Sequence, residues 1–224
     1  CGSNDKSVQV VVNAINHALG SYGSTILPGM PVNFRQGNDE EMAAFVAEVQ
    51  GGKVDGVIFY NCNPVYDYPK GTDLEKALKN VTLTVSTSTT PDETASASAY
   101  MAPDHHYLES WNDAEPKLNS FSLSQPAITP IFKTRQAQES FLVWSGESNT
   151  DYFEFVKEYW RNRFYSASSG IDFQSFWDKC LYDGVFEVAA PSPSYSFTGN
   201  ADAALATIAS TYKASNSGLE LVIY

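Results

Sequence analysis

The stretch "VDGVIFY", residues 54–60, constrains the fold more than any other part of this 224-residue chain. It is apolar at successive positions, so both of its faces should be buried, as in an interior strand of a parallel sheet. A polar loop, the helix-forming "DLEKALKN" and a second strand, "VTLTVS" at 81–86, follow it. This order of strand, helix and strand predicts a parallel α/β unit over residues 38–100.

Capping signals predict where the helices of this unit begin. Asn38 stands before "DEEMAAFVAEVQ", which has an acidic first turn suited to a helix N-terminus. Thr72 with Glu75, and Thr90 with Glu93, have the spacing of capping boxes. The second of these boxes predicts a helix after the strand at 81–86.

Two polar loops follow the predicted strands, at 61–69 and 86–92. In doubly wound sheets, ligands bind beyond the carboxyl ends of the strands, so these loops form the candidate site. The Asn-x-Asn-Pro turn in the first loop holds the backbone extended and leaves amide groups free. Such amides can bind a nucleotide base or phosphate, or the turn can simply connect a strand to a helix; spacing alone leaves both interpretations open.

Helices also flank this unit on both sides. Ser7 is expected to cap a helix over 7–19, and Asn149 or Thr150 to cap "NTDYFEFVKEYWRNRFY". Further helices are predicted at "TRQAQESFLVW", at "DFQSFWDKCLYDG" and after Asn200. The aromatic residues of this second half are interpreted as core.

The final "GLELVIY" reads as a strand, near 219–224, that returns to the same sheet. We therefore expect an α/β domain over 7–130, a helical insertion or extension over 131–215, and a returning strand over 216–224. A buried-looking strand at the last residue also suggests a piece of a longer chain.

The segment "APDHHYLESWNDAEP", residues 102–116, has two competing interpretations. His105, His106 and Glu109 are potential metal ligands, but adjacent histidines point in different directions, and one imidazole with one carboxylate is too small a set. The alternative is a loop whose carboxylates and Trp111 hold neighbouring segments together. We favour this structural interpretation and predict no metal site.

Charge and composition exclude several classes of function. With 14 basic against 26 acidic residues the net charge is −12, which opposes binding to nucleic acid. No apolar run is long enough to cross a bilayer, so direct membrane insertion is not expected. The three cysteines are too widely spaced for a zinc or iron–sulfur motif.

Three stretches together resemble a known family: "VDGVIFYNCNP", "DETASASAYMAPDHHYLESW" and "SLSQPAITPIFKTRQAQESFLVW". They are similar to the molybdopterin oxidoreductases of the dimethyl sulfoxide reductase type. The form "HYLESWxDAEP…QPxIxPxFxTRQxQ" most resembles the molybdopterin-like iron–sulfur subunit of alternative complex III, a quinol-oxidising membrane assembly. The resemblance covers about residues 8–145. The matched residues are Asn63, Pro64, Glu93, Thr94, Ala95, Glu109, Gln125, Pro126 and Pro130.

The resemblance implies a doubly wound, mostly parallel α/β sheet with a helical, aromatic-rich second half. It also implies a scaffold role beside the other subunits of a membrane-bound redox complex on the periplasmic face, with no cofactor in this chain and no catalytic residue. The alternative is an active domain that binds molybdopterin guanine dinucleotide. The cofactor-binding candidates, vestigial in the first case, are Asn61, Asn63, Pro64, Ser86, Thr87, Glu93 and Thr94.

Two departures from the family pattern favour a site that has lost its ligand. Asn61 stands where a glycine is usual, and Tyr100 stands where the family has an aspartate. We expect Tyr100 to fill part of the former pocket, leaving a crevice that is narrow, wet or plugged and holds no nucleotide.

Overall fold

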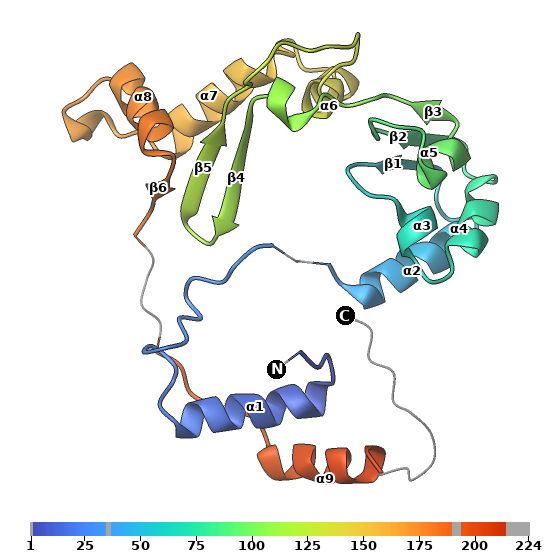
Figure 1. The fold of residues 1–224 in the computed structure, drawn as a ribbon, viewed down its shortest axis with the longest axis vertical. Helices are drawn as coiled ribbons and strands as arrows, with labels where there is room; N and C mark the ends of the chain where they lie inside the picture. Colours follow the sequence, from blue (N-terminus) through green and yellow to red (C-terminus); the bar gives the residue numbers. More distant parts are fainter. Residues whose placement is uncertain (1, 35–36, 190–193, 214–224) are drawn as a thin grey trace. The chain divides into compact units, whose positions relative to one another are not determined.

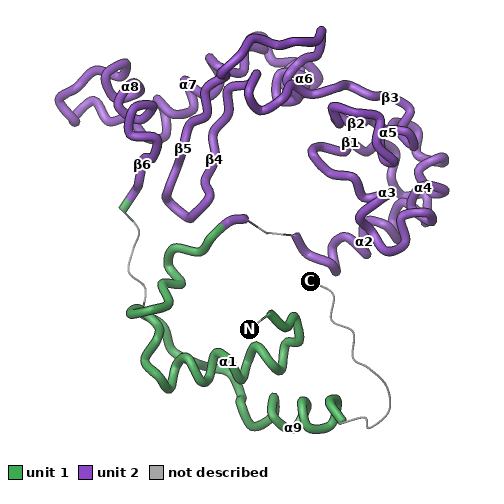
Figure 2. The backbone as a smooth tube through the Cα atoms, in the orientation of Figure 1, with its two compact units in different colours: residues 1–32, 189–224 green, residues 33–188 purple. Residues whose placement is uncertain are grey.

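The computed structural model describes residues 2–34, 37–189 and 194–213. By its internal contacts the chain divides into two compact units, 1–32 with 189–224, and 33–188 (Figure 2). The candidate site lies entirely within the second unit. The domain boundaries expected from the sequence, at 130 and 215, stay predictions, and the strand expected near 219–224 falls outside the described residues.

The first part of the larger unit contains the predicted parallel sheet (Figure 1). Its elements are α2 (Asp39–Gln50), β1 (Gly56–Phe59), α3 (Pro64–Asp67), α4 (Gly71–Leu78), β2 (Leu83–Ser86), α5 (Glu93–Ala97) and β3 (Tyr100–Met101). Strands β1 and β2 pair in parallel, with Gly56 opposite Leu83 and Phe59 opposite Ser86. The parallel pairing predicted for these two strands is confirmed.

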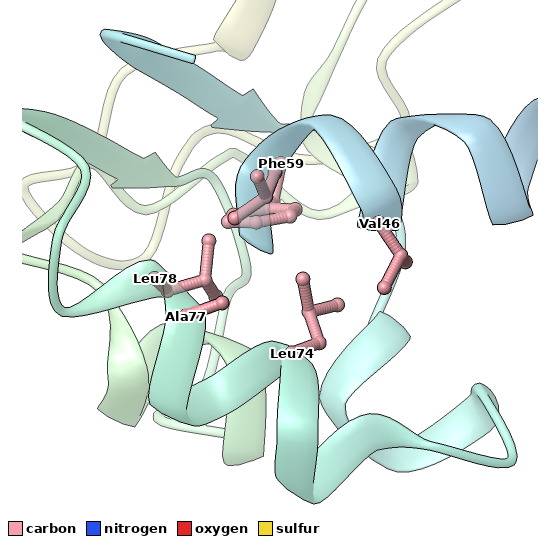
Figure 3. Close-up of a cluster of buried hydrophobic side chains, with 6 residues drawn as sticks. Val46, Phe59, Leu74, Ala77 and Leu78 are labelled. Atoms are coloured by element: carbon pink, nitrogen blue, oxygen red, sulfur yellow. The ribbon is translucent and has the colours of Figure 1, made fainter. Parts of the chain in front are cut away.

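The core of this part lies between β1 and two helices (Figure 3). Phe59 of β1 packs with Val46 of α2 and with Leu74 and Leu78 of α4, and all four side chains are buried. Burying a side chain such as Leu74 contributes about 1.5–3 kcal/mol to stability. The buried apolar side chains of the two helices thus hold them against β1, the strand that precedes the candidate site.

The interior position predicted for β1 is wrong for the described sheet. The strand order is β1-β2-β3, so β2 is central and β1 is an edge. Phe59 faces the core, whereas Ile58 on the opposite face is 46% exposed. A strand that is apolar on both faces therefore has only one of them buried among the described residues.

Several helices begin at a different residue from the one predicted, although Asn38 and Asn200 cap as expected. Asp5 caps the helix predicted to begin at Ser7, and Asp151, not Asn149 or Thr150, caps α7 (Tyr152–Arg163). Asp92 caps α5 through a 2.7 Å bond from the N–H of Ala95. In each of these three helices, the aspartate immediately before the first turn is the cap.

The expected capping boxes built on Thr72 and Thr90 are absent, because both helices start elsewhere. Helix α5 begins only at Glu93, and α4 begins one residue before Thr72, at Gly71. At Gly71 a Cβ atom would lie 1.9 Å from the carbonyl oxygen of Val65. The close approach of α3 and α4 thus sets the start of α4 and requires glycine there.

The second half of the larger unit contains a sheet that the sequence did not predict. Strands β4 (Asn112–Lys117), β5 (Ser120–Ser124) and β6 (Phe186–Glu187) pair in antiparallel fashion. Helices α6 (Ala137–Ser145), α7 (Tyr152–Arg163) and α8 (Phe173–Asp183), and the 3-10 turns η1 (Tyr107–Glu109) and η2 (Ala167–Ser169), complete this half.

The aromatic residues of this half form a core, as predicted. Trp160 of α7 and Trp177 of α8 are buried, with ring centroids 6.0 Å apart, and Phe121 of β5 packs against Trp160. The indole N–H of Trp160 donates to Asp113 at 2.9 Å. The aromatic stripe is thus core packing between the helices and the antiparallel sheet.

The smaller unit is built around two helices. Helix α1 (Lys6–Ala18) packs against α9 (Ala201–Thr211), and the rings of His17 and Phe197 lie 6.2 Å apart. The His17 ring therefore takes part in the contact with Phe197. None of the helices in the described ranges is both long and apolar enough to cross a bilayer.

Candidate functional site

A crevice of about 600 Å³ opens where β1 and β2 end. The two loops predicted to form the candidate site, which follow these strands, form part of its wall. Residues 104–112 and the start of α6 form the rest. Its lining residues are Tyr60, Asn61, Cys62, Asn63, Asp67, Thr87, Ser88, Thr89, Asp92, Asp104, His105, His106, Tyr107, Ser110, Asn112, Gln136 and Gln138.

Asn63 joins the two loops through its side chain. Its Oδ1 accepts hydrogen bonds from the backbone N–H and from the hydroxyl of Thr94, at 3.1 and 2.6 Å, and its Nδ2 donates to Glu93 at 2.7 Å. Thr94, which is fully buried, in turn accepts from the N–H of Val65 at 3.0 Å. The structure therefore brings Asn63, Glu93 and Thr94 together, and they satisfy one another.

Ser86 supports the crevice from behind, and the adjacent Thr87 forms part of its wall. Both are buried, and the N–H and hydroxyl of Thr87 donate to the carbonyl oxygen of Phe59 at 3.0 and 3.3 Å. The hydroxyl of Ser86 accepts from the N–H of Ser88 at 3.2 Å. Of the predicted site residues only Asn61, Asn63 and Thr87 line the crevice, and Pro64 is buried at the start of α3.

The backbone of Asn61 explains one departure from the family pattern. Its φ is +51°, in the left-handed region where glycine is most easily accommodated. Asparagine is among the few other residues that adopt this conformation readily. Asn61 thus preserves the turn and adds an amide side chain to the crevice wall.

Tyr100 does not fill the crevice, so this expectation is wrong. It pairs with Val85, one residue before the end of β2, and its side chain is 62% exposed. It is absent from the crevice lining. A side chain at that register lies too far back along the sheet to reach the loops, and the crevice is consequently open.

The segment 102–116 connects the two halves of the unit, as its structural interpretation predicted. Oδ1 of Asp104 accepts from the N–H of Ala137, at the start of α6, at 2.8 Å. Glu109 accepts from the N–H groups of His106 and Ile131 at 3.0 and 2.9 Å, and it forms a capping box with His106 around η1. His106 and Glu109 are thus engaged as backbone caps.

Sequence reasoning missed several lining residues because they come from outside the two loops. Tyr60 accepts a 2.7 Å hydrogen bond from Gln138 of α6, and its ring lies 5.4 Å from that of Phe141. Gln136 reaches back to the carbonyl oxygen of Trp111 at 2.8 Å. The "TRQAQ" phrase carried a signal, since it belongs to the matched family stretch, but nothing in it pointed to the crevice.

The electrostatic environment of the crevice is acidic. Burial raises the pKa of Tyr60, and the charge of Asp104 raises it further. The pKa of Cys62 is likewise raised by burial, with smaller contributions from Asp92 and Asp67. Among the residues that the structure describes, no lysine or arginine lines the crevice. It therefore favours cations and groups rich in hydrogen-bond donors.

This lining does not fit the pyrophosphate of a pterin guanine dinucleotide. Phosphate groups need cationic side chains or free N–H groups, and here they would meet three carboxylates. The N–H groups of Val65, Ser88 and Thr94 already donate to side chains of the same loops. Among the described residues, no group of three or more histidine, cysteine, aspartate or glutamate side chains is arranged to hold a metal.

Comparison with known proteins gives a fold likeness. No protein family profile matches the sequence, and no curated protein matches it. Among solved structures, acetylene hydratase from Pelobacter acetylenicus is similar, with a TM-score of 0.52 and 16% sequence identity. The match covers 66% of this chain and 21% of that protein, so the chain spans about a fifth of its length. The likeness shows a fold shared with part of that protein.

Proposed function

We propose that this chain is a scaffold part of a molybdopterin oxidoreductase-like subunit, without a catalytic cofactor of its own. The subunit would belong to a membrane-associated, quinol-oxidising electron-transfer complex, on the periplasmic face. The proposal combines the fold likeness with the sequence resemblance to the alternative complex III subunit. The chain's contribution is to hold neighbouring subunits, and its isolated form catalyses nothing.

One observation supports the proposed absence of a cofactor: the loops that would hold a dinucleotide are hydrogen-bonded to each other. The amide nitrogen of Asn63 donates to Glu93 and its amide oxygen accepts from Thr94, so both groups are already hydrogen-bonded. Acidic side chains line the remaining space. A phosphate entering there would have to displace these bonds and lie against carboxylates. Both effects oppose binding.

The test is metal and pterin analysis of the natural protein purified with its partner subunits. We expect quinol oxidation by the complex, with molybdenum, tungsten and pterin far below a stoichiometric amount relative to this chain. Stoichiometric metal together with pterin would overturn the cofactor-free role. Purification of the protein free of any membrane subunit under mild detergent would overturn its place in the complex.

A second candidate function is an active molybdopterin guanine dinucleotide-binding domain. The position of the open crevice, at the carboxyl ends of β1 and β2, favours it. Titration with guanine nucleotides separates the two functions. The scaffold role predicts no saturable binding below about 1 mM, equivalent to roughly 4 kcal/mol. Micromolar binding that Asn63→Ala abolishes would establish the second function.

A further inference from the structure

The crevice presents carboxylate oxygens that have no partner among the described residues. The side chain of Asp67 makes no hydrogen bond or ion pair with them. Asp92 and Asp104 use only Oδ1, in bonds to the N–H groups of Ala95, His105 and Ala137. Each of the three aspartates thus keeps acceptor capacity for a bound group.

The carboxylates favour an organic cation over a metal ion. No described set of acidic, histidine or cysteine side chains is clustered tightly enough to ligate a metal, so the negative charge is spread around the wall. Flat aromatic surfaces stand beside it, including Tyr60 and the rings of His106 and Tyr107, which lie 4.3 Å apart. Dispersed acceptors with aromatic faces suit a guanidinium, which donates from several N–H groups and stacks on rings.

An apolar rim adjoins the crevice at η1. Tyr107 and Leu108 lie on this turn and are 72% and 38% exposed, and Ile131 and Phe132 are 70% and 74% exposed. The N–H of Ile128 donates to the carbonyl oxygen of Leu108 at 3.0 Å, so the two exposed segments are held together. Exposed apolar groups around a polar pocket are typical of protein interfaces, where arginine and aromatic residues carry most of the binding energy.

The side chain of His105 is a second, independent indication that the crevice binds a ligand, because one of its ring nitrogens lacks a hydrogen-bond partner among the described residues. It lines the crevice, and its Nε2 atom is buried without a hydrogen-bond partner among the described residues. An unsatisfied buried polar atom costs about 1–3 kcal/mol, so native structures rarely retain one. A small shift of the ring on binding would let an N–H group of a ligand complete it.

We propose that this crevice binds an arginine side chain presented by a neighbouring subunit, while apolar residues of the same segment cover the rim. The inference rests on the proposed scaffold function and names the partner chemistry of its site. The chain's net charge of −12 would steer a basic segment toward it. In this proposal the crevice, a cofactor pocket that no longer holds its ligand, serves as a contact site for a neighbouring subunit.

A matched pair of peptides tests the proposal on the full 224-residue chain. One is a blocked pentapeptide with a central arginine between two leucines, and the other carries citrulline, which has the same shape without the charge. Calorimetry and amide chemical shifts are recorded for both. We expect the citrulline peptide to bind at least about tenfold more weakly, as loss of a charge-assisted pair predicts.

Charge-neutralising variants then locate the binding. The double variant Asp67→Asn with Asp92→Asn should weaken the arginine peptide about tenfold, and it should fold because asparagine still caps α5. Asp55→Asn is the matched control, because Asp55 precedes the opposite end of β1 and does not line the crevice. Equal binding of the two peptides, equal binding to all variants, or no saturation by the arginine peptide would overturn the proposal.

Crosslinking in the purified complex identifies the natural occupant. A benzoylphenylalanine at Thr89, an exposed lining residue, should capture an arginine-containing segment of another subunit. Crosslinks confined to this chain, or competition by guanine nucleotide, would contradict the inference. Metal and pterin analysis tests the proposed function separately. If the complex contains no cofactor and the chain binds the arginine and citrulline peptides equally, only the inference about arginine binding is refuted.

Discussion

Replacing Asn63 by alanine tests whether the bonding between the two loops stabilises the α/β part. The change removes an acceptor that serves the N–H and the hydroxyl of Thr94, at 3.1 and 2.6 Å. Thr94 is fully buried, so each group loses its partner, at about 1–3 kcal/mol apiece. Water from the adjoining crevice can replace part of this bonding, which sets the expected loss of unfolding free energy at about 2–4 kcal/mol.

Urea unfolding and thermal melting measure this loss. For a chain of this size the melting temperature should fall by roughly 5–15 °C. All four tryptophans lie outside the parallel sheet, at 111 and beyond, so their fluorescence follows the aromatic half while circular dichroism follows both halves. We expect the dichroism to be lost before the fluorescence changes, because the perturbation lies between β1 and α5.

Asn80→Ala is the matched control. Asn80 is exposed, and its side chain makes no hydrogen bond with the described residues, so its loss should cost less than about 0.5 kcal/mol. If Asn63→Ala is no more destabilising than this control, the assignment of a structural role to Asn63 is refuted.

The same variant changes an acid titration. The hydrogen bond from Asn63 lowers the pKa of Glu93, so Glu93 contributes stability above its unfolded pKa and loses it as the pH falls through the folded value. Asn63→Ala should raise the pKa of Glu93 toward its ordinary value, as seen by carboxyl NMR. The stability difference between parent and variant should therefore narrow at acidic pH.

Three further outcomes are expected. Gly71→Ala should destabilise the chain by at least about 3 kcal/mol, because the new Cβ would lie 1.9 Å from the Val65 carbonyl oxygen. Gly56→Ala, whose Cβ would have its nearest neighbour at 3.7 Å, should cost far less. Urea unfolding measures the stability of both variants. Trp160→Phe should reduce the free energy of unfolding by about 2–4 kcal/mol, because it leaves a void in the core and removes the indole donor to the Asp113 carboxylate. Unchanged stability in the same urea assay would contradict this packing. Burial raises the pKa of Cys180 to about 11, so iodoacetamide at mildly alkaline pH should modify it only after denaturation, as mass spectrometry of timed samples would show.

Local sequence signals predicted the elements whose residues all lie close together along the chain. The parallel pairing of 54–60 with 81–86 followed from two apolar runs separated by a predicted helix. The pairing is observed, with two helices, α3 and α4, between the strands. Asn38 and Asn200 act as caps because the cap and the first turn are adjacent in sequence. The aromatic spacing of 152–183 likewise indicated a buried helical face.

The antiparallel sheet escaped prediction for a physical reason. Strand β4 has the sequence "NDAEPK", whose residue types are among the least favourable for strands, and β5 is dominated by serine. Pairing with β6 comes from residues 186–187, far along the chain. Cross-strand bonding and packing under the aromatic core outweigh the local preference.

The sequence by itself determined the place of the candidate site, because parallel strands direct their following loops to one edge of the sheet. Only the tertiary structure decided what that place contains. The bonds of Asn63 to Thr94 and of Asp104 to Ala137 join residues 31 and 33 positions apart. The register of β3 places Tyr100 opposite Val85, before the end of β2, and Tyr100 does not line the crevice. Hydrogen bonding between distant segments depends on how the loops meet in space, which no local pattern encodes.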